Sequence, residues 1–155
     1  MKELIINVVD WAAKNNVLDK KYSEKQFLKI IEEVGELCQA ILKDNEPDKV
    51  DAIGDIMVTL IIYQHQVDGL IDLDTIIAAC QLPSDFEPRF NDIPDLLRIV
   101  ALSELNNSSG LEYAAYRSLA KIAKFNCYSL EECLDAAYNV IKDRNVKLVN
   151  GTLVK

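Results

Sequence analysis

Hydrophobic residues recur at helical spacing along nearly the whole chain, and the alternation typical of β-strands is nearly absent. Only five glycines and four prolines interrupt this pattern. Helices are predicted at residues 2–15, 23–43, 48–67, 73–81, 95–106, 111–125 and 129–144. The pattern therefore predicts an all-α fold, built as a helical bundle.

Capping residues set the expected helix boundaries. Ser23, with Gln26 three residues later, has the spacing of a capping box at the start of the second helix. The segment from Asp44 to Pro47 breaks that helix, and Asp48 can cap the third. A turn is expected in the tail at Asn150-Gly151.

The two halves of the chain resemble each other. We predict one helical unit at residues 1–82, which carries the acidic cluster described below, and a second at 83–155, packed into the same globule. The second unit would be a degenerate copy of the first; the alternative is a chance likeness between amphipathic helices. The aligned segments are 28–37 with 96–105 and 73–79 with 130–136.

The second predicted helix carries an acidic pattern. Lys29, Glu32, Glu33 and Glu36 form the spacing KxxEExxE and fall within an arc of about 100° on one face of the helix. The opposite face is apolar and carries Ile31, Val34, Leu37, Cys38, Ile41 and Leu42. A solvated acidic face would explain this pattern equally well, so the acids need a second observation to indicate a site.

The third predicted helix supplies that observation. From Ala52 to Tyr63 it is apolar on almost every side, as in a buried helix, and Asp55 is its only charge. A buried carboxylate must be paired, protonated or bound to metal, because desolvation alone costs several kcal/mol. Asp51 lies about 40° from Asp55 around the helix axis and can join it. Gly54 costs roughly 1 kcal/mol in a helix interior, so we expect another backbone or a ligand to approach closely there.

A short connection makes these two helices antiparallel neighbours, so their carboxylates can converge. Several acids in one place repel one another unless a divalent cation collects them. Oxygen ligands suit Mg²⁺ or Mn²⁺, and a chain with one histidine has no comparable set of nitrogen and sulfur ligands. The predicted metal ligands are Glu32, Glu33, Glu36, Asp51 and Asp55. Because Mg²⁺ keeps waters and substrate phosphates among its ligands, we expect a phosphate-processing site.

These motifs resemble those of the MazG-like family of all-α nucleoside triphosphate pyrophosphohydrolases, which is related to dimeric dUTPases and to phosphoribosyl-ATP pyrophosphohydrolase. The residues that carry the resemblance are Glu32-Glu33-Val34-Gly35-Glu36-Leu37 and Gly54-Asp55. The resemblance covers about residues 1–80 and resumes between Ala137 and Gly151. The chain departs from the family pattern at Ala52, where the family has an acid three residues before Asp55; Asp51 stands one residue earlier.

The resemblance implies metal-dependent hydrolysis of a nucleoside triphosphate between its α and β phosphates, which yields a monophosphate and pyrophosphate. Glu33 and Glu36 are the catalytic candidates, one of them as general base. Substrate contacts are expected from Lys29, Lys142 and Arg144 to the phosphates and from Trp11 to the base. Alternatively, Trp11 is a core residue, and Lys142 and Arg144 stabilise the C-terminus of their helix by interacting with its dipole. Family members usually build a four-helix bundle from two chains, so we expect a homodimer or a higher homo-oligomer.

Composition limits the classes of partner that the protein can be expected to bind. The formal net charge of −8 argues against a nucleic-acid polymer or an anionic membrane as partner. The longest apolar stretch is far below the roughly 20 residues of a membrane span. Four cysteines without CxxC spacing predict buried free thiols and a cytoplasmic location. Two other functions remain open: a non-catalytic helical module that binds nucleotides or another protein, and a phosphoribosyl-ATP pyrophosphohydrolase-like enzyme.

Overall fold

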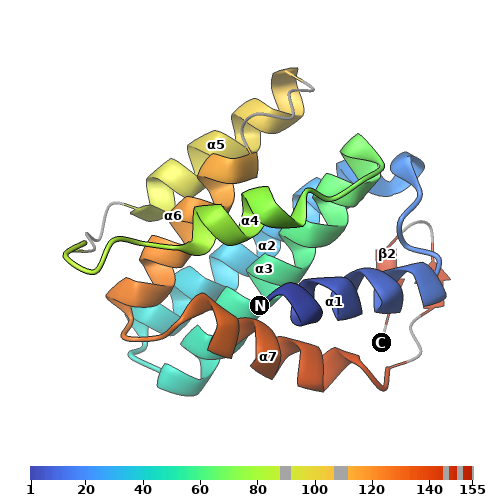
Figure 1. Cartoon of the computed structure of the whole chain (residues 1–155). Coiled ribbons are helices and arrows are strands. Elements are labelled where there is room, and N and C mark those ends of the chain that lie inside the picture. Colours follow the sequence, from blue (N-terminus) through green and yellow to red (C-terminus); the bar gives the residue numbers. More distant parts are fainter. Residues whose placement is uncertain (88–91, 107–111, 145–146, 150–151, 155) are drawn as a thin grey trace.

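The computed structural model of the chain describes residues 1–87, 92–106, 112–144, 147–149 and 152–154. In these ranges the chain is mostly helical, which confirms the predicted all-α class (Figure 1). The helices are α1 (Lys2–Lys14), α2 (Ser23–Leu42), α3 (Glu46–Asp68), α4 (Leu73–Cys80), α5 (Asp92–Asn106), α6 (Glu112–Phe125) and α7 (Leu130–Ile141). A short 3₁₀ helix, η1 (Lys20–Tyr22), precedes α2. No helix in the described ranges is both long and apolar enough to span a membrane.

A small antiparallel hairpin that the sequence pattern did not predict follows α7. Its strands, β1 (Lys147–Val149) and β2 (Thr152–Val154), pair with Leu148 opposite Leu153. Each strand has only three residues, too few to show a period-2 pattern. The turn expected at Asn150-Gly151 lies outside the described residues.

The predicted capping box at the start of α2 is wrong. Ser23 is already helical, with φ −58° and ψ −41°, because η1 runs directly into α2, and no side chain caps the helix. Gln26 turns inward instead, and its Nε2 donates a hydrogen bond of 3.1 Å to the backbone carbonyl of Thr59 on α3. A capping box does occur at α7, between Ser129 and Glu132.

The predicted cap of α3 is also wrong. The helix begins at Glu46, and the side chain of Asn45 accepts a hydrogen bond from the N–H of Asp48. Pro47 therefore lies in the first turn of the helix, where its missing N–H breaks no hydrogen bond.

Helix α3 lies at the centre of the bundle. It packs against α1, α2, α6 and α7, and residues 52–54 and 56–64 are all buried. This confirms the buried helix that the all-round apolar pattern predicted. Asp55 is half-buried within this run.

The buried face of α2 overlaps the predicted apolar face only in part. Ile30, Glu33 and Leu37 are buried, whereas Ile31 is 37% exposed and Leu42 is 87% exposed. The face of α2 that contacts α3 therefore includes one of the acids as well as apolar residues. Because α2 is rotated about its axis relative to the prediction, Glu33 lies inside the bundle.

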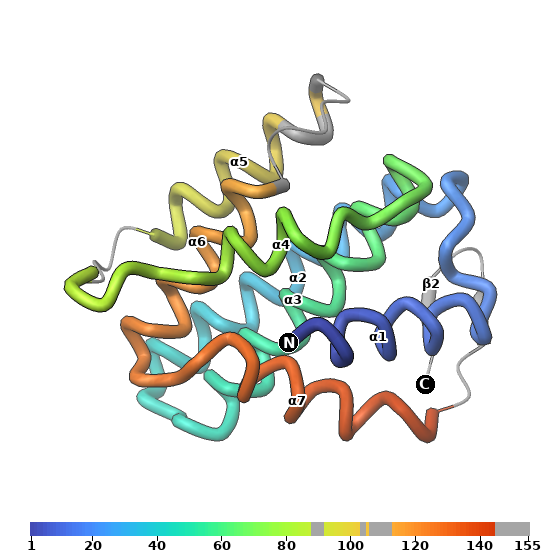
Figure 2. Tube along the Cα trace, in the orientation of Figure 1, coloured from blue at the N-terminus to red at the C-terminus, as the bar shows by residue number. Residues whose placement is uncertain are grey.

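Each half of the chain packs helices against the other half. Helix α2 packs on α3 as α5 packs on α6, and α3 packs on α7 as α6 packs on α4 (Figure 2). Buried residues from both halves belong to one hydrophobic cluster. Two copies of a three-helix unit would produce this reciprocal pattern; the duplication itself remains a prediction.

Gly54 allows α7 to pack closely against α3. A Cβ atom at this position would lie 2.2 Å from the carbonyl oxygen of Cys133 and 2.7 Å from the Cβ of Ala137. The close backbone approach predicted for Gly54 is therefore confirmed. Its consequence is that the end of α7 reaches the space between α1 and α3.

The cysteines are free, but their predicted burial is only partly correct. Cys133 is buried, Cys38 and Cys80 are half-buried, and Cys127 is exposed. Cys127 has φ +66° in the connection between α6 and α7, and this turn carries its side chain outward.

Candidate functional site

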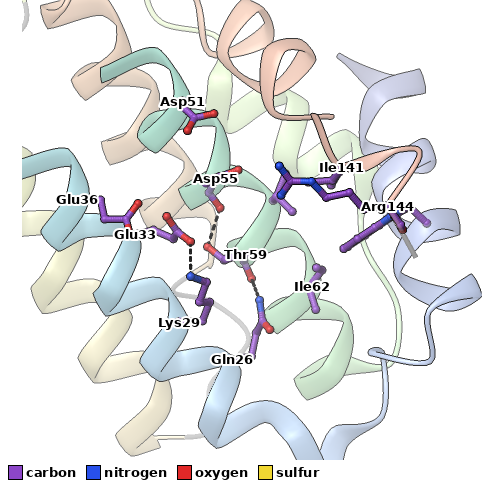
Figure 3. A pocket seen from close by; sticks show the side chains of 12 residues that line it. Gln26, Lys29, Glu33, Glu36, Asp51, Asp55, Thr59, Ile62, Ile141 and Arg144 are labelled. Atoms are coloured by element: carbon purple, nitrogen blue, oxygen red, sulfur yellow. Dashed lines mark hydrogen bonds and ion pairs between the residues drawn. The ribbon is translucent and has the colours of Figure 1, made fainter. Parts of the chain in front are cut away.

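A cavity of about 200 Å³ opens between α1, α2, α3 and the segment that follows α7 (Figure 3). Its carboxylates gather where the N-terminal half of α3 faces the middle of α2, and both apolar and polar side chains line the remainder. The lining residues are Trp11, Gln26, Lys29, Glu33, Glu36, Asp51, Asp55, Val58, Thr59, Ile62, Ile141 and Arg144.

Glu33 is the most deeply buried acid of the cavity, with a side chain that is 5% exposed. Its Oε1 atom lies 2.7 Å from Nζ of Lys29, while its Oε2 atom is buried and accepts no hydrogen bond from the described residues. Burial raises the pKa of Glu33, and the pairing with Lys29 only partly opposes this. The charges of Glu36 and Glu32 raise this pKa further.

Lys29 is the cation at the centre of the carboxylates. It also pairs with Glu32, at 2.8 Å. Burial disfavours the ammonium charge, but the hydrogen bonds to Glu32 and Glu33 outweigh this and raise the pKa of Lys29 to about 12. Lys29 therefore keeps its charge at neutral pH.

Asp55 has the most strongly perturbed carboxyl of the cavity. Burial, followed by the charges of Glu33 and Asp51, raises its pKa to about 7; Lys29 opposes this shift. The Asp55 carboxyl therefore binds a proton much more readily than an exposed aspartate does, and a bound cation would favour its ionised form.

The described residues fit a hard divalent cation by their chemistry. Glu33, Glu36, Asp51 and Asp55 offer carboxylate oxygens from two facing helices, as Mg²⁺ prefers. The Oε2 atom of Glu33 has no hydrogen-bond partner in the described part of the chain, and the pKa of Asp55 is raised; a bound cation would relieve both conditions. As the side chains stand, no three His, Cys, Asp or Glu residues in the described ranges form a group that could hold a metal ion.

The cavity brings most of the predicted site residues together. Glu33, Glu36, Asp51, Asp55, Lys29, Trp11 and Arg144 all line it. Glu32 lies outside it, with a side chain that is 57% exposed and turned to Lys29. Lys142 is exposed, and it donates to the side chain of Asn139 on α7 instead of reaching the cavity.

Trp11 and Arg144 form one unit at the edge of the cavity. Trp11 is 7% exposed and belongs to the hydrophobic core, and its Nε1 donates a hydrogen bond of 3.3 Å to the backbone carbonyl of Arg144. The side chain of Arg144 extends across the cavity toward α3 (Figure 3).

Five lining residues were not among the predicted site residues: Gln26, Val58, Thr59, Ile62 and Ile141. The apolar ones carry no signal that separates them from core residues. Gln26 did carry such a signal, because a buried polar side chain on a helix face needs a hydrogen-bond partner. Its spacing from Ser23 suggested a capping role instead.

The fold and this cavity define an all-α protein with a carboxylate-lined cavity between its helices. The chain is 37% identical over 75 residues to an uncharacterized 18.2 kDa protein in the rep-hol intergenic region of Haemophilus phage HP1 (strain HP1c1). That similarity covers 46% of this chain and 45% of the phage protein. No protein-family model and no solved structure matches the chain.

Proposed function

We propose that the protein is a metal-dependent nucleotide pyrophosphohydrolase of the MazG-like kind, which hydrolyses a nucleoside triphosphate between its α and β phosphates. The observation that carries this proposal is the half-buried Asp55, which shares one cavity with Glu33, Glu36 and Asp51. The resemblance of the EExxE and Gly-Asp motifs to that family supports the same conclusion.

The charge of the cavity supports a cation-dependent reaction. Its lining has four carboxylates against two cations, Lys29 and Arg144. A triphosphate would be repelled from such a surface, because like charges in a partly desolvated cavity interact strongly. Glu33, Glu36, Asp51 and Asp55 would hold Mg²⁺ or Mn²⁺. When bound there, the ion would neutralise the phosphates and lower the pKa of a water molecule.

The chain's own residues have separate roles in this proposal. Glu33 or Glu36 accepts the proton of the attacking water, and burial, which raises the pKa of Glu33, makes that carboxylate a stronger base. Lys29 and Arg144 donate charge-assisted hydrogen bonds to phosphate oxygens from two sides of the cavity. The apolar part of the cavity holds the nucleoside.

The experiment is a pyrophosphate-release assay across ribo- and deoxyribonucleoside triphosphates with Mg²⁺ or Mn²⁺. Turnover by the unaltered protein, and its loss in both Glu33→Gln and Asp55→Asn at unchanged helical content, is the expected result. Full activity in both variants would contradict the proposal. The molecular mass in solution tests the accompanying expectation of a homodimer or higher homo-oligomer, and a fractionation experiment tests the expected cytoplasmic location.

A second candidate is a non-catalytic module that binds nucleotides or another protein. The pairing of Lys29 with both Glu32 and Glu33 favours it, since such an ion network satisfies part of the acidic cluster without a metal. This candidate predicts no metal-dependent turnover of any nucleotide, phosphoribosyl-ATP included. It also predicts no thermal stabilisation by Mg²⁺.

A further inference from the structure

Part of the cavity lining is apolar. It comes from Val58 and Ile62 on α3, Ile141 at the end of α7 and Trp11 on α1. Ligand sites of this kind combine an apolar wall with a few placed polar groups that set orientation and specificity. Gln26 supplies such a group here.

The amide of Gln26 is held in one orientation. The side chain is only 8% exposed, and its Nε2 donates to the backbone carbonyl of Thr59 at 3.1 Å. Because a carbonyl oxygen can only accept, the NH₂ group must face α3 and the Oε1 atom must face away from it. Figure 3 shows this amide on the wall of the cavity, below Thr59.

The Oε1 atom of Gln26 accepts no hydrogen bond from the described residues, and the side chain lines the cavity. The residue thus presents a fixed acceptor beside an apolar wall. A phosphate has no N–H and would be repelled by a carbonyl oxygen, so this acceptor does not suit the triphosphate. An N–H on the edge of a nucleobase does suit it.

We propose that Gln26 is a specificity-determining residue: its Oε1 accepts a hydrogen bond from an N–H of the nucleobase, whose ring packs on Val58, Ile62 and Ile141. This inference rests on the proposed function, since it assigns the base to the apolar lining beside Gln26. The substrate class is then a nucleotide whose base has an N–H donor, and inorganic polyphosphates and base-free sugar phosphates are excluded.

A site built around one hydrogen bond discriminates strongly against a ligand that lacks the matching group, because the buried acceptor is then left unpaired. Loss of this single bond is expected to weaken binding by roughly 10-fold or more. Loss of this hydrogen bond is expected to weaken binding of the base without changing the reaction at the carboxylates.

The experiment uses nucleosides, which have no phosphate and need no metal. Uridine, cytidine, adenosine and inosine are titrated into the metal-free, ¹⁵N-labelled chain. The readout is the indole N–H signal of Trp11, the one tryptophan of the sequence and a residue of the cavity wall. Each nucleoside that binds is compared with its partner in which the donor is methylated: 3-methyluridine, N4,N4-dimethylcytidine, N6,N6-dimethyladenosine or 1-methylinosine.

At least one nucleoside is expected to shift the Trp11 signal saturably, and its methylated partner to bind at least 10-fold more weakly. Gln26→Leu, which keeps the side-chain volume, is expected to weaken the parent nucleoside to the same extent. Gln39→Leu is the matched control, because Gln39 lies exposed on the same helix and outside the cavity; it should bind as the unaltered chain does.

Absence of binding by all four nucleosides would overturn the proposal, as would equal binding of the methylated partners or of Gln26→Leu. If Gln26→Leu fails to fold, the methylated nucleosides with the unaltered chain decide the question. Gln26-dependent nucleoside binding without pyrophosphate release would refute the proposed hydrolysis alone. Hydrolysis of triphosphates with no sensitivity to the base or to Gln26 would refute this inference alone.

Discussion

The indole N–H of Trp11 donates a hydrogen bond to the backbone carbonyl of Arg144, a residue 133 positions later in the chain. This contact joins α1 to the segment that follows α7 and holds the backbone of Arg144 at the edge of the cavity. Trp11 thus has a positioning role that neither a core tryptophan nor a base-stacking residue would require.

Trp11→Phe tests this role. Phenylalanine keeps most of the apolar packing but removes the N–H, so Arg144 loses its tether. We expect KM for the nucleotide to rise several-fold while kcat changes little, since in the proposed function Arg144 binds phosphate and takes no part in proton transfer. Steady-state kinetics provide the measurement. In an Arg144→Ala background, Trp11→Phe should have almost no further effect on KM, and additive effects would argue against the tether.

Adjacent glutamates on α2 should differ sharply. Glu33 is buried in the cavity, whereas Glu32 is exposed outside it, so Glu33→Gln is expected to lower kcat by at least 100-fold, in the range of a lost catalytic base or metal ligand. Glu32→Gln, the same change one residue earlier, should lose less than 10-fold. Pyrophosphate release under saturating Mg²⁺ measures both. Equal losses in the two variants would show that side-chain burial does not separate their roles.

Asp55 should make the metal-free protein less stable as the pH rises. Its pKa is about 7 in the folded chain and near 3.8 when unfolded, so between these values the folded state binds more protons. The contribution of Asp55 to the unfolding free energy therefore falls from about pH 4 to pH 7 and stays low above that. Other carboxylates have lowered pKa values and act with the opposite sign, so the unaltered chain is compared with Asp55→Asn. In the presence of EDTA, the melting temperature of the unaltered chain should fall relative to that of Asp55→Asn between pH 5 and pH 8. A difference that does not change with pH would contradict the raised pKa.

Mg²⁺ should restore the unfolding free energy that Asp55 removes at high pH. A cation that binds only the folded state raises the unfolding free energy by about 2.7 kcal/mol at 100 times its Kd. We expect a concentration-dependent rise in melting temperature at pH 8, which Glu33→Gln and Asp55→Asn should abolish. The same titration with Glu32→Gln serves as the control and should resemble that of the unaltered chain. No rise in any variant would favour the non-catalytic module.

Two glycines in helices should respond oppositely to alanine. A Cβ at Gly54 would overlap the Cys133 carbonyl, so Gly54→Ala must push α7 away from α3, and we expect a loss of about 3 kcal/mol or more of unfolding free energy. Among the described residues, no atom beyond the neighbouring helix backbone lies within 4 Å of a Cβ at Gly35. Gly35→Ala should stabilise the chain by about 0.5–1 kcal/mol, because glycine is a poor helix former. Urea denaturation measures both, and a neutral Gly54→Ala would contradict the close helix contact.

Much of the helical framework follows from local pattern. The helices were predicted within a few residues of their observed ends because periodicity and breakers act over one or two turns. The corrections at Ser23 and Asp48 share one cause. A polar side chain near a helix start can cap that helix or bond elsewhere, and nearby structure such as η1 or Pro47 decides between these outcomes.

The sequence by itself determined the all-α class, the buried third helix and the set of acids from which a site could form. An all-round apolar helix has to be buried, and a carboxylate within it has to be accommodated. Only the tertiary structure decided that Glu33 faces the cavity while Glu32 does not, because neighbouring residues on a helix differ by about 100° and the position of α3 sets which one is buried. The partners of Gln26 and Trp11 lie 33 and 133 residues away, and no local pattern encodes contacts at such separations. The Gln26 contact exists because α2 packs on α3, and the Trp11 contact exists because Gly54 lets α7 pack against α3 and the chain returns to its own first helix.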